Sequence, residues 1–438
     1  MAPEPTGAAA LDAAWLAGRR WFRHKGRHIE AVELADSAPL GDGCSLLVLA
    51  VRLDGPEVVR YVVPASGRGA EARETADGEG AWRALAGWLV GGQSHRSTAG
   101  AFTCHPAPPL GRLLPGGMGE LATLAESRIS GEQSNTSVRL GDRLMLKLYR
   151  LVEPGINPEV EVCSFLSDAG FRHAPAVAGW IEYAADGADG TSGAATAIVQ
   201  EQVVARGDGW SWMLDRLRDR PRGPAEALAG IALLGGVTAE MHAALRSRPN
   251  APGFEAGPAA AGDLAAWQAS ALQQLDGALA AVDGDAGRRL AELAPGLRDA
   301  LEAIGRASGA IRSRIHGDFH LGQLLATDGG FAVIDFEGEP ARTLAERRRP
   351  SSPLRDVAGM LRSLDYAART VEREEGADLG GWLDDARAAF LAAYGDATDA
   401  DLLRGLEVEK ACYEVRYEAA NRPDWTWLPL DALERLAA

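Results

Sequence analysis

The chain has 438 residues, of which 46% are hydrophobic and 24% charged, so it can bury a sizeable core and fills roughly two to three domains. Its formal net charge of −16 argues against nucleic acid or an anionic membrane as a partner and favours a small-molecule substrate. Four widely spaced cysteines indicate neither a zinc site nor a disulfide framework, as expected for a protein of the reducing cytoplasm.

The N-terminus and the apolar segments give no sign of export. The first residues carry no basic group ahead of an apolar stretch, so they do not fit a secretion signal. No run reaches the roughly 18 consecutive apolar residues that a membrane-spanning helix needs. We therefore expect a cytoplasmic protein without a membrane partner, either a monomer or a small homo-oligomer.

The first part of the chain predicts a small α+β module. A short amphipathic helix over 11–22 is followed by β-like runs and a second helix, at 29–34, 45–53, 58–63 and 81–89. Proline- and glycine-rich segments between 106 and 117 then break the pattern. We place an N-terminal cap subdomain at 1–112.

The next segment is rich in predicted strands and the last is overwhelmingly helical. Strands are expected at 125–130, 137–140, 143–149 and 197–204, with a helix over 157–166 that carries Pro158 in its first turn. We assign 113–205 to a strand-rich ATP-binding subdomain and 206–438 to a helical C-terminal lobe. The predicted class is α+β, a bilobal protein-kinase-like fold in which the nucleotide binds between the lobes.

The strongest chemical signal is His316-Gly317-Asp318-Phe319-His320-Leu321-Gly322-Gln323, followed by Asp335-Phe336-Glu337. Asp318 is the predicted general base that accepts the proton of an acceptor hydroxyl, and Gln323 and Asp335 are the predicted ligands of Mg²⁺. A hairpin over 324–334 would return Asp335 beside Asp318. The alternative is a simple turn and strand end whose carboxylates act as caps or are solvated.

Lys147 lies inside the apolar run Leu144–Leu148. A buried ammonium needs a partner, and Glu159 and Glu161 on the following helix are the candidates. We prefer Glu161, because it lies deeper in the helix, as the residue that orients Lys147 toward the ATP phosphates. The alternative is a lysine at a strand edge whose ammonium reaches solvent.

Two further segments are candidates for nucleotide contacts. The loop 131–137 offers the backbone amides and polar side chains of Ser134 and Asn135 to phosphate oxygens, although it contains one glycine and fits no standard phosphate loop. The segment from Gln200 to Val204, with Gln202 at its centre, is the predicted hinge that reads the adenine edge. A plain polar hairpin and an ordinary buried strand are equally good interpretations.

The C-terminal segment 409–427 is dense in acids and aromatic rings. Glu414, Tyr417, Glu418 and Asn421 share one face of a predicted helix, which suits a polyhydroxylated or amino-bearing ligand. A solvated charged helix is the alternative. The predicted contacts to the acceptor are Asp318, His320, Glu409, Glu414, Tyr417 and Trp425.

These residues together resemble the bacterial maltokinases and the actinobacterial glucosamine kinases, which share the aminoglycoside-phosphotransferase-like fold. The resemblance spans nearly the whole chain and rests on blocks at 20–27, 134–137, 146–148, 157–161, 316–323, 335–340, 344–347, 355–362 and 413–418. It implies an N-terminal cap, an ATP-binding subdomain and a helical lobe. It also implies that Asp318 is the base, Gln323 and Asp335 bind magnesium, and Lys147 contacts phosphate.

The identity of the acceptor is open at this point. Maltokinases tend to have Ala-Gly where this chain has Arg23-His24, and its tail, Trp425-Thr426-Trp427-Leu428-Pro429-Leu430, is bulkier than theirs. A smaller pocket next to an acidic helix favours glucosamine, phosphorylated at its 6-hydroxyl, over maltose, phosphorylated at its anomeric hydroxyl. An aminoglycoside or choline acceptor, and a catalytically inactive sugar- or nucleotide-binding pseudokinase, are more remote alternatives.

Overall fold

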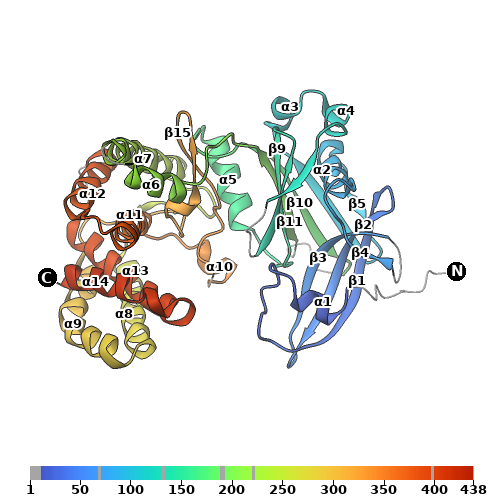
Figure 1. Cartoon of the computed structure of the whole chain (residues 1–438). Coiled ribbons are helices and arrows are strands. Elements are labelled where there is room, and N and C mark those ends of the chain that lie inside the picture. Colours follow the sequence, from blue (N-terminus) through green and yellow to red (C-terminus); the bar gives the residue numbers. More distant parts are fainter. Residues whose placement is uncertain are drawn as a thin grey trace. The chain divides into compact units, whose positions relative to one another are not determined.

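The computed structural model describes residues 11–67, 71–129, 134–187, 193–219, 222–340, 342–395 and 399–437. Its contacts divide the chain into two units, Met1–Ser167 with Pro175–Val204 and Asp168–Ala174 with Ala205–Ala438. The first unit is rich in strands and the second in helices, which confirms the mixed α+β class with a helical C-terminal part (Figure 1). The division into three domains at 112 and 205 stays a prediction.

A four-stranded antiparallel sheet opens the first unit, with strands in the order β1 (Ile29–Gly41), β2 (Cys44–Leu53), β3 (Val58–Ser66) and β4 (Arg73–Glu74). Alternate residues of β2 point to opposite faces of the sheet. Leu47 and Leu49 pack with Trp21 and Phe22. Cys44, Leu46 and Val48 pack with helix α2 (Ala81–Gly91) instead. Because both faces are covered, β2 is apolar along almost its whole length.

The second sheet of this unit has seven antiparallel strands in the order β5-β6-β10-β11-β9-β8-β7. Their bounds are His95–Arg96, Gly100–Pro106, Val177–Ala185, Ala194–Glu201, Leu144–Tyr149, Asn135–Leu140 and Glu126–Arg128. Sequence patterns missed β6 and β10, which pair with each other across more than 70 residues of chain. Glycine and proline bound β6, and its partner is too distant for a local pattern to reveal.

Helix α5 (Pro158–Asp168) follows strand β9 and begins where the sequence predicted. The side-chain oxygen of Asn157 accepts hydrogen bonds from the backbone amides of Glu159 and Val160, at 2.9 and 3.1 Å. Pro158 occupies the first helical position, where its missing N–H costs nothing. This cap fixes the direction in which the first turn of α5 presents its side chains.

Helices dominate the second unit. The longer ones are α6 (Gly209–Arg218), α7 (Gly223–Leu245), α8 (Ala261–Ala281), α9 (Gly284–Ala303), α11 (Leu354–Glu375), α12 (Gly380–Tyr394), α13 (Ala400–Asn421) and α14 (Trp427–Ala437). Helix α13 is packed against α8, α9, α11 and α14 (Figure 1). It carries the acidic and aromatic residues predicted to face the acceptor, and it ends at Asn421 as the sequence indicated.

Helix α7 is long and apolar enough to cross a membrane by length and composition alone, which the search for uninterrupted apolar runs missed. Half of its most apolar window is buried inside the protein. Its buried residues include Ile231, Leu234 and Met241. A core helix of a globular domain has this same composition, and α7 contacts α6, α12 and strand β15 (Gly330–Val333) in that role.

The hairpin predicted over 324–334 is confirmed. Strands β14 (Leu324–Thr327) and β15 pair in antiparallel register, with Leu324 opposite Val333 and Thr327 opposite Gly330. The turn at the tip uses Gly330 with φ +123°, a conformation that glycine adopts without strain. Gln323 precedes the first strand of the hairpin and Asp335 follows the second by two residues, so both lie at the open end of the hairpin.

Candidate active site

Asp356 of helix α11 fixes the backbone of the loop that carries Asp318. The backbone amides of His316 and Gly317 donate to the two carboxylate oxygens of Asp356, at 2.8 and 2.9 Å, and His242 Nε2 lies 3.0 Å from the same group. Asp356 is 1% exposed. Burial raises its pKa, but the hydrogen bond from His242 and the adjoining positive charge bring the pKa below its ordinary value. An ionised, fully bonded carboxylate thus fixes the loop backbone.

Close packing also fixes this loop. Gly359 faces the loop from α11, and a Cβ atom built on it would lie 2.6 Å from the carbonyl oxygen of Phe319. Only glycine allows helix and loop backbones to approach so closely. The ring of Phe319 is 2% exposed, so the residue after Asp318 is anchored in the core.

The same loop is joined to the end of the hairpin. His316 Nε2 lies 3.0 Å from the carbonyl oxygen of Ile334, and the backbone amide of Ile334 donates to Gln323 O at 3.0 Å. Gln323 Nε2 donates to Asp335 Oδ2 at 3.1 Å. The structure therefore brings the two predicted magnesium ligands side by side, beside the loop of Asp318. Asp335 has φ +65°, a strained conformation for a non-glycine residue of the kind found at functional sites.

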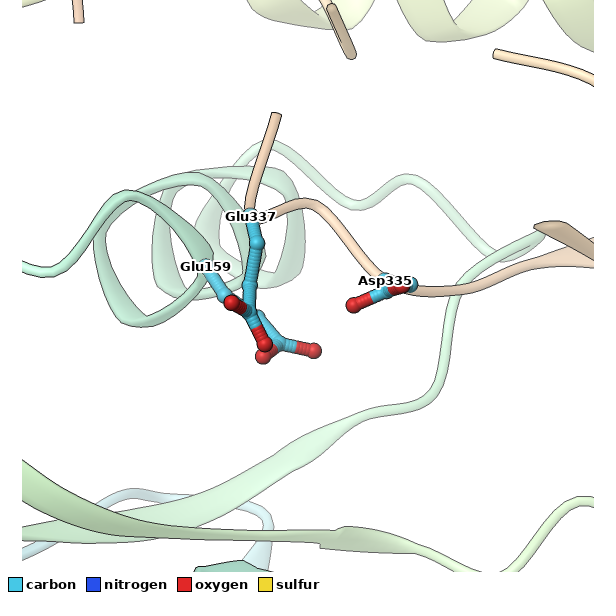
Figure 2. A group of neighbouring side chains, drawn as sticks. All are labelled: Glu159, Asp335 and Glu337. Atoms are coloured by element: carbon cyan, nitrogen blue, oxygen red, sulfur yellow. The ribbon is translucent and has the colours of Figure 1, made fainter. Parts of the chain in front are cut away.

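Glu337 adds a carboxylate that the sequence analysis did not single out as a ligand. One of its oxygens lies within 4.8 Å of an oxygen of Asp335, and both side chains extend from the loop after β15 (Figure 2). Two carboxylates and an amide form a set of oxygen donors that suits Mg²⁺. The motif Asp335-Phe336-Glu337 contained this signal, because residues two apart in an extended loop can point the same way.

Asp318 lines a pocket that is partly open to solvent. Lys410 Nζ lies 3.5 Å from Asp318 Oδ1, and His320 Nε2 lies 3.9 Å from Asp318 Oδ2. Burial lowers the pKa of His320 below its ordinary value, against the attraction of Asp318. Polar residues that line the pocket include Gln274, Glu339, Arg342, Arg355, Glu409 and Tyr413.

Besides Asp318, two of the predicted acceptor residues lie at this pocket or at the open one beside it. Glu409 is 4% exposed, and its carboxylate accepts from Arg355 Nη1 at 2.6 Å and from Ser270 Oγ at 3.3 Å. Tyr417 lines the neighbouring pocket, where its ring stacks on Tyr413 with centroids 6.4 Å apart. Two adjacent tyrosine rings form an apolar platform of the type that packs against a sugar ring.

The other predicted acceptor residues are engaged elsewhere. Arg362 donates twice to Glu414 Oε2, at 2.7 and 2.9 Å, so this carboxylate belongs to a buried ion pair. The Cζ atoms of Arg373 and Arg422 lie 5.9 and 5.3 Å from the ring centroid of Trp425, so both guanidinium groups cover this ring. His320 Nδ1 accepts the backbone amide of Gly322 and caps the turn before β14. Contacts of these three with an acceptor stay predictions, and Glu414 and Trp425 already have structural partners.

In the first unit, Lys147 pairs with Glu159, the candidate that the sequence analysis ranked second. Lys147 Nζ lies 2.9 Å from Glu159 Oε2, which also accepts from Tyr149 OH at 2.7 Å. Glu159 comes from the first turn of α5 and is 2% exposed (Figure 2). The two glutamates are two residues apart, about 200° around the helix axis, so only one of them faces strand β9. The contact at 2.9 Å makes Glu159 the better candidate for orienting Lys147, and the role of Glu161 stays a prediction.

The predicted nucleotide segments are described in part. Residues 131–133 of the phosphate loop lie outside the described residues, Ser134 precedes strand β8, and Asn135 is its first residue. Strand β11 ends at Glu201, and the backbone amide of Gln202 donates to Arg143 O at 3.0 Å. Val204, the last residue of the first unit, is 82% exposed. An apolar side chain exposed at this point can pack against a flat base.

Comparison with known proteins places this geometry in a family. Residues 126–406 match the model of the phosphotransferase enzyme family, and residues 15–103 match the maltokinase N-terminal cap domain. The chain belongs to the phosphotransferase enzyme family. This confirms the family that the motifs indicated.

Several members of the phosphotransferase enzyme family are similar over most of the chain. A glucosamine kinase of Streptacidiphilus jiangxiensis is 33% identical over 71% of this chain and 73% of its own length. A glucosamine kinase of Mycolicibacterium smegmatis is 28% identical over 71% of this chain and 79% of its own length. A solved glucosamine kinase in complex with glucosamine, ADP and inorganic phosphate is 28% identical, with a TM-score of 0.74 and 99% of both chains covered. A second crystal form reaches a TM-score of 0.77.

As a phosphotransferase, the chain has four site residues that sequence reasoning did not assign. They are Asp356, which holds the loop of Asp318, Glu337 beside Asp335, Tyr149 beside Glu159, and Lys410 beside Asp318. Asp356 was visible only as part of the family block 355–362. Lys410 carried no local signal, because it lies 92 positions after Asp318 and meets it only through the packing of α13.

Proposed function

We propose that the chain is an ATP- and Mg²⁺-dependent sugar kinase that transfers the γ-phosphoryl group of ATP to the 6-hydroxyl of glucosamine. The observation that carries this proposal is the likeness, over 99% of the chain, to a glucosamine kinase solved with glucosamine, ADP and inorganic phosphate. The 33% identity to a curated glucosamine kinase supports it independently. The pocket at Asp318 gives the acceptor a place beside the base.

The proposed roles follow from the positions of the residues. Asp318 takes the proton of the 6-hydroxyl as that oxygen attacks the γ-phosphorus, and ADP departs with the electrons of the broken bond. Lys147, oriented by Glu159, neutralises phosphate charge, and Ser134 and Asn135 border the phosphates. Gln202 and Val204 contact the base. Asp335, Gln323 and Glu337 would hold magnesium, which supplies charge neutralisation at the phosphoryl group.

The charges of the pocket suit an amino sugar. Its lining contains four carboxylates, Asp318, Glu339, Glu346 and Glu409, together with the cations Arg342, Arg347, Arg349, Arg355 and Lys410, so an ammonium group can meet a carboxylate from several sides. Glu339 and Glu409 pair with Arg342 and Arg355, both at 2.6 Å, and Asp318 lies 3.5 Å from Lys410. Glu346 is an exposed residue of the first turn of α10 (Leu344–Arg347), where it closes a capping box with Thr343. The 2-ammonium group of glucosamine would add a cation to these charge pairs, whereas maltose is neutral.

A second candidate function is phosphorylation of maltose at its anomeric hydroxyl. The match of residues 15–103 to the maltokinase N-terminal cap domain favours it. The open pocket next to Asp318, lined by Tyr413 and Tyr417, offers space for a second sugar ring. The curated and solved relatives named above are glucosamine kinases, which ranks this candidate second.

The setting that we propose is a cytoplasmic enzyme, either a monomer or a small homo-oligomer, whose partners are a small sugar and ATP, with no nucleic-acid or membrane partner. The net charge of −16 and four buried, unbridged cysteines support it. The three subdomains, 1–112, 113–205 and 206–438, are part of the same proposal.

The experiment that tests the function is a panel of sugars incubated with ATP and Mg²⁺, with products identified by mass spectrometry. The panel holds glucosamine, glucose, maltose, N-acetylglucosamine and one aminoglycoside. We expect glucosamine monophosphate as the main product, with phosphorus–proton coupling that places the group on C6. Phosphorylation of maltose alone, or of no sugar in the panel, would overturn the proposal.

A further inference from the structure

Lysine is rare in this chain, and its positions are informative. Of the 45 basic residues only three are lysines, Lys25, Lys147 and Lys410, and all others are arginines. Arginine spreads its charge over a planar fork, whereas lysine places a compact point charge at the end of a flexible stem. In a chain that otherwise uses arginine, a lysine indicates a position at which the structure or the chemistry needs a compact ammonium group. Lys147 already has such a role beside Glu159.

Lys410 is the lysine nearest to the proposed base. It lies on α13, its side chain is 28% exposed, and its Nζ atom is 3.5 Å from Asp318 Oδ1. The ammonium also lies 4.8 Å from the ring centroid of Tyr413, one turn further along the helix. It is thus held between a carboxylate and an aromatic face, at the wall of the pocket that Asp318 lines.

The neighbouring ion pairs of α13 are built differently. Glu409 pairs with Arg355, and Glu414 pairs with Arg362, in both cases through hydrogen bonds of 2.6 to 2.9 Å. In both pairs the guanidinium group of an arginine hydrogen-bonds directly to the buried carboxylate. At 3.5 Å, the ammonium of Lys410 stands slightly back from Asp318 and leaves the carboxylate able to accept another hydrogen bond. A general base needs this freedom, because it must take a proton from the acceptor.

We propose that Lys410 is a positioning residue for phosphoryl transfer, which acts through Asp318 by placing a positive charge beside that carboxylate and holding it turned toward the acceptor hydroxyl. The inference rests on the proposed kinase function. The ammonium also reduces the repulsion between the Asp318 carboxylate and the incoming anionic phosphoryl group. In the loop of Asp318 itself, His316 to Gln323, no lysine or arginine is present to do this, so α13 supplies the cation.

The charges around the pair support a permanently cationic Lys410. Burial lowers the pKa of Lys410, but attraction by Asp318, and after it by Glu414, Tyr413 and Glu339, raises the pKa above its ordinary value. His320 faces Asp318 from the loop side, and its own pKa is lowered by burial. Lysine therefore stays charged over the pH range in which the enzyme is assayed.

The test compares the variants Lys410→Met and Lys410→Arg with Lys25→Met, which makes the same chemical change at an exposed lysine of the first unit. For each protein, kcat and kcat/KM for the acceptor are measured from pH 5 to pH 9, together with KM for ATP and the melting temperature. We expect K410M to lose about 10²-fold in kcat. The acidic limb of its plot of kcat/KM against pH should move to higher pH by about one unit.

The controls separate a positioning role from a structural one. K410R should keep the pH profile of the wild type because it keeps the charge, with a smaller loss of kcat, and K25M should match the wild type. An unchanged acidic limb in K410M, whether activity is retained or lost together with melting temperature, would overturn the proposal. If the wild type phosphorylates maltose and not glucosamine, the proposed substrate is wrong, and the same comparison with maltose still tests Lys410.

Discussion

Asp318 is the residue on which the proposed chemistry depends most directly. It lines the pocket, and its backbone neighbours are held by Asp356 and by the packing of Phe319. Asp318→Asn keeps the shape of the side chain but cannot accept the proton, so kcat should fall by about 10²- to 10⁴-fold. Calorimetry should give an ADP dissociation constant within about twofold of the wild type. A variant that retains a tenth of the wild-type turnover would contradict the assignment of the base.

The pairing of Lys147 gives a second prediction for single residues. Glu159→Gln removes the carboxylate that lies 2.9 Å from the buried ammonium of Lys147, whereas Glu161→Gln leaves that contact in place. We expect E159Q to lower the free energy of unfolding by about 3 kcal/mol and to raise KM for ATP. E161Q should have the smaller effect on both. Urea unfolding and steady-state kinetics measure them, and the reverse order of the two variants would restore the original preference for Glu161.

The sequence could predict these residues only where the signal was local. Asp318, Gln323 and Asp335 were predicted together because one loop and one hairpin contain all three. The choice between Glu159 and Glu161 depended on the rotation of α5 about its axis, which its cap and its packing determine. Lys410 and Asp356 act on the same loop from helices far along the chain, and neither position has a local pattern that reveals the contact.

At the scale of elements, the close contact between α11 and the loop of Asp318 constrains the site. Gly359→Ala would place a methyl group 2.6 Å from the carbonyl oxygen of Phe319. Alanine favours the helix by up to about 1 kcal/mol over glycine, but forced separation of two backbones costs about 1–3 kcal/mol. We expect G359A to be less stable and to lose kcat because the loop shifts.

The matched control for G359A is Gly236→Ala on α7. No atom lies within 4 Å of the Cβ position at Gly236, so this substitution should add about 0.5–1 kcal/mol of stability and leave kcat unchanged. Thermal unfolding and kcat are measured for both variants. If G359A is as stable and as active as G236A, the close approach of helix and loop does not constrain the site.

Helix α11 also gives a prediction for the pH dependence of stability. The folded-state pKa of Asp356 lies below its ordinary value near 3.9. For a carboxyl group with a lowered pKa, the stabilisation is fully present above the unfolded-state pKa and is lost as the pH falls through the folded-state pKa. The cost of Asp356→Asn, measured by urea unfolding, should therefore be largest near neutral pH and shrink below about pH 4. A cost that is constant from pH 7 to pH 3 would contradict this account.

At the scale of the whole molecule, fold class and family were predictable from the sequence, and the pairing of distant strands was not. Helices and hairpins arise from local periodicity, so α2, α5 and the β14–β15 hairpin were placed correctly. Strands β6 and β10 form one sheet from separate parts of the chain, and no local pattern indicates that pairing. The pocket at Asp318, where we propose that the acceptor binds, is assembled from several distant segments, so no local pattern reveals it.

The most direct test of the account is the ratio of kcat/KM for glucosamine to kcat/KM for maltose, measured with saturating ATP and Mg²⁺ on the full chain. Because the proposal rests on the likeness to a glucosamine kinase solved with glucosamine, the account predicts a ratio of about ten or more. A tenfold preference for maltose would contradict the assignment of the acceptor.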